Sequence, residues 1–107
     1  MSLTTHVLDT VRGCPAAGVK IELWSLDSKS RLKCLTTNQD GRTDEPLLSE
    51  AEQGTGAYEL IFHVGAYFGE ATFFDQVPVR FTISDPETKY HIPLLVSPWA
   101  YTTYRGS

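Results

Sequence analysis

The sequence predicts an all-β protein, an antiparallel sandwich or barrel of about eight short strands with one short helix. Apolar and polar residues alternate along several short runs, a pattern typical of strands with one face on a core. Turn-forming stretches such as RGCPAAG, NQDGRTDEP and SDPETK separate these runs. The 107 residues, 41% hydrophobic and 21% charged, fit a single globular domain over residues 1–107.

The expected strands, in chain order, occupy residues 5–11, 19–26, 32–38, a short piece near 42–47, 57–64, 78–84, 89–96 and 99–105. In the strand at 89–96, Tyr90, Ile92 and Leu94 share the face that we expect to meet the core. Residues 65–73 lack alternation, and we expect the short helix there. Pro93 cannot donate to a strand ladder, so it predicts an edge position or a nitrogen that points away from the neighbouring strand.

Composition argues against several function classes. The net charge is −4 and no basic stripe is present, which argues against a nucleic-acid partner. No apolar run approaches the roughly 20 residues that a membrane helix needs. The start MSLTTHVLD lacks the pattern of a secretion signal, so we expect a cytoplasmic protein in which Cys14 and Cys34 are reduced thiols. Neither cysteine lies in a CxxC motif, and a catalytic role for either is not expected.

Two histidines and one arginine are the candidates for chemistry. His6 and His91 lie opposite the core-facing residues of their strands, and imidazole suits proton transfer near neutral pH. His63 also points outward, and we interpret it as a surface residue. Arg42 follows Asp40-Gly41, which indicates either a simple hairpin turn or a guanidinium held beside a tight turn to orient a planar ligand. No metal-ligand spacing, phosphate-binding glycine loop or GxSxG motif is present.

Three stretches carry more information together than apart: THVLDTVRGCPAAGVKIELW, DGRT and YHIPLLVSPWAYTTYRGS. The whole chain resembles the transthyretin-like family, and the terminal YRGS, with His6, Arg42 and His91, resembles the branch that hydrolyses 5-hydroxyisourate. The resemblance implies a two-sheet sandwich of eight strands with one short helix. It also implies a homotetramer, in which dimers continue sheets edge to edge and two dimers enclose a central channel.

The resemblance further implies an activity and a set of roles. The reaction converts 5-hydroxyisourate to 2-oxo-4-hydroxy-4-carboxy-5-ureidoimidazoline in urate degradation, without metal or cofactor, at the dimer–dimer interface. His6 and His91 would activate water and shuttle protons, in an order that stays open, and Arg42 would bind the substrate. Tyr104 would contact the substrate ring, and Arg105 and Ser107 would complete the polar wall. Two alternatives remain: a carrier of small aromatic ligands without catalysis, and a structural sandwich with no site.

The last residues, AYTTYRGS, predict a tail tucked beside the histidines. Thr102 and Tyr104 project from one face of the final strand, and we expect Arg105-Gly106 to form a tight turn. Ser107 would then bring its hydroxyl and a carboxylate close to a histidine and raise the pKa of that histidine. We also expect Leu95, Trp99 and Tyr101 to lie near subunit contacts.

Overall fold

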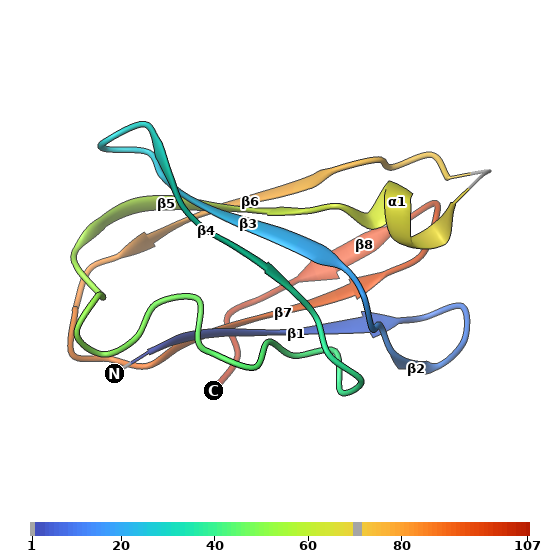
Figure 1. The fold of residues 1–107 in the computed structure, drawn as a ribbon, viewed down its shortest axis with the longest axis horizontal. Coiled ribbons are helices and arrows are strands. Elements are labelled where there is room, and N and C mark those ends of the chain that lie inside the picture. The colour runs from blue at the N-terminus through green and yellow to red at the C-terminus, as the bar shows by residue number, and fades with distance from the viewer. Residues whose placement is uncertain (1, 70–71) are drawn as a thin grey trace.

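The computed structural model describes residues 2–69 and 72–107. Two four-stranded sheets pack face to face, as Figure 1 shows, with strand orders β2-β1-β7-β8 and β4-β3-β5-β6. The elements are β1 (Leu3–Asp9), β2 (Cys14–Pro15), β3 (Lys20–Ser25), β4 (Ser30–Thr36), β5 (Gly56–Phe62), α1 (Val64–Phe68), β6 (Val77–Ile83), β7 (Tyr90–Val96) and β8 (Tyr101–Thr103). No helix of the described residues is long and apolar enough to cross a bilayer.

The predicted sandwich of eight strands with one short helix is confirmed, with four differences. Strands β1 and β7 pair in parallel, so the first sheet is mixed and not purely antiparallel. Residues 14–15, expected in a turn, form β2, whereas residues 42–47, expected as a strand, form an irregular loop. The helix expected over 65–73 is observed at Val64–Phe68, and residues 70–71 lie outside the described part of the chain.

The core lies between the two sheets, where the alternating residues meet. Leu3 and Val7 of β1 are fully buried, as are Leu60 of β5 and Leu94 of β7. Burying one such side chain contributes about 1.5–3 kcal/mol, which fixes the face that each strand turns inward. Thr4 and His6 on β1, and His91 on β7, therefore lie on the outer face of the first sheet.

A long loop between β4 and β5 covers the edge of β1. The Val7 N–H donates to the Gly41 carbonyl at 2.8 Å, and the Leu47 N–H donates to the Leu3 carbonyl at 2.8 Å. Gly41 has φ 74°, and a Cβ there would clash with the Val7 carbonyl oxygen. Glycine at this position thus lets the loop lie directly on β1, and it carries Arg42 to the edge of the outer face.

The tail after β8 stays beside β7. The paired ladder ends at Thr103, and the next partner on β7 is Pro93, which has no N–H to donate. Pairing resumes where the Gly106 N–H donates to the His91 carbonyl at 2.7 Å. The tail therefore remains extended and in register, which corrects the expectation of a tight turn at Arg105-Gly106. Pro93 itself lies in a central strand between β1 and β8, not at a sheet edge.

Candidate active site

A cavity of about 530 Å³ opens on the outer face of the first sheet. Its walls come from β1, β7, the loop after Gly41 and the chain tail, and the lining residues are Ser2, Thr4, Thr5, Arg42, Thr43, Asp44, Glu45, Pro46, Lys89, His91 and Ser107. Three predicted site residues, Arg42, His91 and Ser107, thus meet in one cavity although they are far apart in the sequence.

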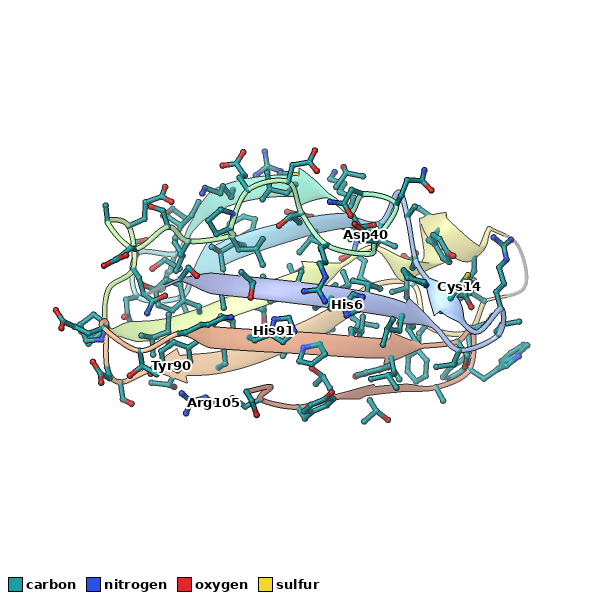
Figure 2. All side chains as sticks on the ribbon, turned by 90° about the horizontal axis from the view of Figure 1, so that it is seen from below. His6, Cys14, Asp40, Tyr90, His91 and Arg105 are labelled. Carbon is teal, nitrogen blue, oxygen red and sulfur yellow. The ribbon has the colours of Figure 1, made fainter. Side chains whose placement is uncertain are left out.

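His6 lies beside this cavity and does not line it. It shares the outward parity of Thr4, and it pairs across the sheet with Pro93. Figure 2 shows His6 and His91 on the same outward face of neighbouring strands. The partner of His6, Pro93, lies two residues after His91 on β7, so the two histidines are near neighbours on this face. In a single chain, His6 and His91 therefore lie on the same surface, but only His91 lines the cavity.

The half-buried ring of His91 has a pKa lowered below the ordinary value of a histidine. Burial is the largest cause, because it penalises the charged form, and the positive charges of Arg42, His6 and Lys89 act in the same direction. The hydrogen bond with Thr4 opposes these effects. The expectation of a raised histidine pKa is therefore wrong for His91, which is neutral near pH 7 and able to accept a proton.

A tight turn fixes the backbone of Arg42. The Asn38 carboxamide oxygen accepts the N–H groups of Asp40 at 2.9 Å and Arg42 at 3.2 Å, and the Asn38 N–H donates to the Arg42 carbonyl at 2.7 Å. Among the described residues, no carboxylate forms an ion pair with the Arg42 guanidinium. The turn and the functional interpretation of DGRT are thus compatible, since a rigid turn presents an unpaired cation to the cavity.

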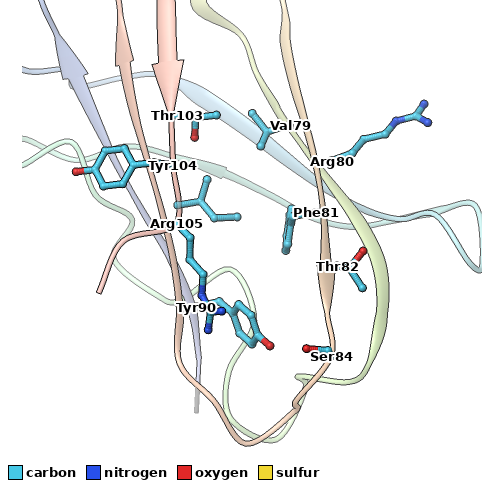
Figure 3. A pocket seen from close by; sticks show the side chains of 10 residues that line it. Val79, Arg80, Phe81, Thr82, Ser84, Tyr90, Thr103, Tyr104 and Arg105 are labelled. Atoms are coloured by element: carbon cyan, nitrogen blue, oxygen red, sulfur yellow. The ribbon is translucent and has the colours of Figure 1, made fainter.

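Tyr104 and Arg105 point to opposite sides of the sheet, because successive residues of an extended chain alternate. The Arg105 guanidinium carbon lies 4.5 Å from the ring centroid of Tyr90 and borders a second pocket of about 260 Å³ beside β6. Figure 3 shows the Tyr104 ring directed away from Tyr90 and Arg105, and this ring is 56% exposed. Tyr104 and Arg105 both border this second pocket and neither lines the histidine cavity, so the role of each in substrate binding stays a prediction.

Two cavity residues were missed in the sequence. Lys89 lies two positions before His91, so the same alternation that placed His91 outward indicates that Lys89 shares its face. Thr4 approaches His91 through the parallel pairing of β1 with β7, which no local pattern reveals. Lys89 adds a second cation beside Arg42, and Thr4 contacts the imidazole directly.

His63 belongs to a different part of the molecule. It follows β5 in the second sheet, where its Nε2 lies 2.5 Å from the Glu22 carboxylate. Glu22 also accepts a hydrogen bond from the Trp24 indole at 3.1 Å. His63 is thus half-buried and paired, and it is remote from the cavity on the first sheet.

Comparison with known proteins identifies the family to which this fold and cavity belong. The model of the HIUase/Transthyretin family matches residues 3–106, and the chain belongs to this family. Within it, 5-hydroxyisourate hydrolase 2 of Rhizobium meliloti (strain 1021) is 50% identical to this chain over 98% of the chain and 95% of that protein.

Solved structures agree with this family. The 5-hydroxyisourate hydrolase of Klebsiella pneumoniae superposes with a TM-score of 0.87 at 35% identity, covering 100% of both chains. Transthyretin from Sparus aurata superposes with a TM-score of 0.89 at 27% identity, covering 98% of this chain and 96% of that chain. The same backbone therefore occurs in a hydrolase and in transthyretin, and the side chains of the cavity must distinguish the two.

Proposed function

We propose that this protein is a 5-hydroxyisourate hydrolase, which opens the substrate to 2-oxo-4-hydroxy-4-carboxy-5-ureidoimidazoline during urate degradation. The observation that carries the proposal is the meeting of a neutral histidine, His91, with an unpaired guanidinium, Arg42, in one cavity. The relatives named 5-hydroxyisourate hydrolase match this chain over nearly its full length.

The reaction adds water to a ring carbonyl and breaks the adjacent carbon–nitrogen bond. Neutral His91 takes a proton from the attacking water, and the water oxygen bonds to the carbonyl carbon. When the tetrahedral intermediate collapses, the carbon–nitrogen bond breaks and the imidazolium returns the proton to the departing nitrogen. The carboxylic acid that forms releases the second proton of the water to solvent, so a carboxylate and a ureido nitrogen remain and no further reactant is needed. His6, on the same face, takes part in this proton transfer.

Cations of the cavity stabilise the charge that develops on the carbonyl oxygen. Arg42 presents a planar fork that matches paired oxygen acceptors, and its backbone is held by the Asn38 turn. Lys89 adds positive charge to the same wall. Ser107 contributes a hydroxyl, and Tyr104 on the adjoining outer face contacts the substrate ring. The expectation that no metal or cofactor takes part stays a prediction.

We also propose that the complete site forms in a homotetramer. Support comes from the outer face of the first sheet, which carries His6 outside the cavity together with exposed or half-buried apolar residues. Leu95 is half-buried and Tyr104 is 56% exposed on this face, and a second copy packed there would cover them and enclose both histidines, whereas Tyr101 pairs with the core residue Val96 and faces the other side. Cys14 and Cys34 are exposed and unpaired, which supports our proposal of a cytoplasmic location.

The decisive experiment follows the ultraviolet absorbance of freshly oxidised urate with and without catalytic amounts of the protein. A hydrolase accelerates the decay of 5-hydroxyisourate over many turnovers. A carrier of the transthyretin type, a structure of which was solved in complex with thyroxine, would bind a ligand stoichiometrically without changing the decay rate. An unchanged rate at excess substrate would therefore overturn the proposed function.

A further inference from the structure

Two residues to which the proposed reaction assigns no role hold the ring of His91 from two sides. On one side, the Thr4 hydroxyl oxygen lies 2.8 Å from His91 Nδ1. On the other side, the backbone of Gly106 packs against the ring, so that a Cβ at Gly106 would lie 2.7 Å from His91 Cδ2. The Gly106 N–H also donates to the His91 carbonyl at 2.7 Å, which ties the tail to the strand that carries the histidine.

These three residues form a row across the sheet. The parallel register pairs Thr4 with His91, and the antiparallel bridge pairs His91 with Gly106. Residues directly opposite each other in neighbouring strands share a face, so the Thr4 side chain, the imidazole and the open side of Gly106 all lie outward. The row therefore brings together the start of the chain, the strand β7 and the tail.

We propose that Thr4 and Gly106 are positioning residues for His91, which hold its Nδ1 proton and leave Nε2 free for the reaction. Thr4 accepts the Nδ1–H in both the neutral base and the imidazolium, so the ring keeps one orientation while Nε2 takes and returns a proton. Among the described residues, no hydrogen bond engages Nε2. Gly106 leaves room for the ring edge, and any larger residue displaces it. The catalytic part of this inference rests on the proposed function.

The variant Thr4→Val tests the hydroxyl, because it keeps the branched shape and removes the acceptor. We expect kcat to fall about tenfold, which corresponds to about 1.4 kcal/mol, with little change in KM. Thr4→Ser keeps the hydroxyl and restores most of kcat. Gly106→Ala lowers kcat as well, whereas Gly54→Ala, where a Cβ would meet only the Tyr58 hydroxyl at 3.7 Å, leaves kcat unchanged.

A nitrogen NMR measurement of the His91 ring separates positioning from catalysis, because it needs no substrate. The native protein should show the Nδ1–H tautomer, and Thr4→Val should show a mixture of both tautomers. If Thr4→Val kept the native tautomer and native kcat, the inference would be overturned. If the native protein turned over no 5-hydroxyisourate but lost its fixed tautomer in Thr4→Val, positioning by Thr4 would stand and the proposed function would fall.

Discussion

At the scale of single residues, the charges around His91 decide when it can act as a base. Lys89 shares the cavity and lowers the pKa of His91. Replacing Lys89 with methionine removes that charge, so the pKa of His91 rises toward its ordinary value. Because the base works only when unprotonated, the acid limb of kcat/KM then moves to higher pH.

The measurement is a pH–rate profile of kcat/KM for native protein and Lys89→Met. Lys20→Met is the matched control, since Lys20 is exposed on β3 of the other sheet. Its acid limb should coincide with that of the native protein. An unshifted limb in Lys89→Met would show that His91 is not the group that titrates.

Asp9 and Tyr67 form a buried pair that matters for stability. The Asp9 carboxylate accepts the Tyr67 hydroxyl at 2.7 Å and the N–H groups of Val11 and Arg12 at 2.9 and 3.0 Å. Burial alone raises the pKa of Asp9, but the hydrogen bonds from Tyr67, Arg12 and Val11 outweigh it and leave this pKa lowered. The pKa of Tyr67 is raised to about 12, mainly by burial and then by the hydrogen bond to Asp9 and the negative charge of Asp9.

Tyr67→Phe should lower the free energy of unfolding by about 1–3 kcal/mol, because one buried lone pair of Asp9 loses its donor. Urea unfolding measures this, with Tyr101→Phe as the control, because no hydrogen bond engages the Tyr101 hydroxyl among the described residues. The pair also sets two pH windows. Stability from the lowered pKa of Asp9 is present above 3.8 and is lost as pH falls through the lower folded value. Stability from the raised pKa of Tyr67 is present below 10 and is lost as pH rises toward about 12. If Tyr67→Phe and Tyr101→Phe lowered the free energy of unfolding equally, the stabilising role of the Asp9–Tyr67 hydrogen bond would be contradicted.

At the scale of elements, alternation predicted the faces of the strands and hence the outward histidines. The inward residues Tyr90, Ile92 and Leu94 are all buried, as their period of two indicated. The parallel contact of β1 with β7 could not be predicted locally, because it joins segments about 87 residues apart through the shared core. The contact of Thr4 with His91 depends on that pairing, and the wall formed by the loop after Gly41 depends on backbone hydrogen bonds between that loop and β1.

The tail after β8 likewise has one feature that the sequence predicted correctly and one that it did not. Strict alternation places Tyr104 outward and Arg105 inward, whereas a glycine near the end suggested a turn. The backbone hydrogen bond from Gly106 to β7 keeps the tail extended. Alternation was therefore the better guide here, and small size at the ring of His91, not an unusual dihedral, accounts for Gly106.

The loop that carries Arg42 depends on Gly41. Gly41→Ala places a Cβ against the Val7 carbonyl in a left-handed conformation, so the loop must move away from β1. We expect the free energy of unfolding to fall by more than the roughly 1–2 kcal/mol that such a conformation costs alone, and kcat/KM to fall because Arg42 moves with the loop.

Gly13→Ala is the control for this loop variant. Gly13 has φ 69°, but a Cβ there meets nothing within 4 Å. It should show only the conformational cost in urea unfolding and retain native kcat/KM. Indistinguishable behaviour of the two variants would show that the contact with Val7 does not position Arg42.

At the scale of the whole molecule, the two sheets offer different outer faces. The first sheet carries the cavity, His6 and Leu95, and the second carries the ion pairs of Glu22 and Glu59. The edge strands are β2 and β8 in the first sheet and β4 and β6 in the second, and an edge strand offers backbone groups that can pair with another chain. Both features support assembly through the first sheet and the free edges.

In the homotetramer that we propose, Leu95 lies at the contact between copies, so Leu95→Arg should give smaller species with loss of activity, as measured by light scattering and turnover on the same sample. Ile61→Arg introduces the same charge at a half-buried position on the outer face of the second sheet and should remain tetrameric. A native protein that was monomeric and fully active at dilute concentration would contradict a site built between subunits.

The central claim is that the outer face of the first sheet performs the hydrolysis through His91, and the most direct measurement compares two matched variants. His91→Gln and His63→Gln each replace one half-buried histidine with an amide, one on each sheet. In the 5-hydroxyisourate decay assay, we expect His91→Gln to lose about 10²–10⁴-fold in kcat and His63→Gln to retain native turnover. Native turnover in folded His91→Gln, or an equal loss in both variants, would contradict the claim.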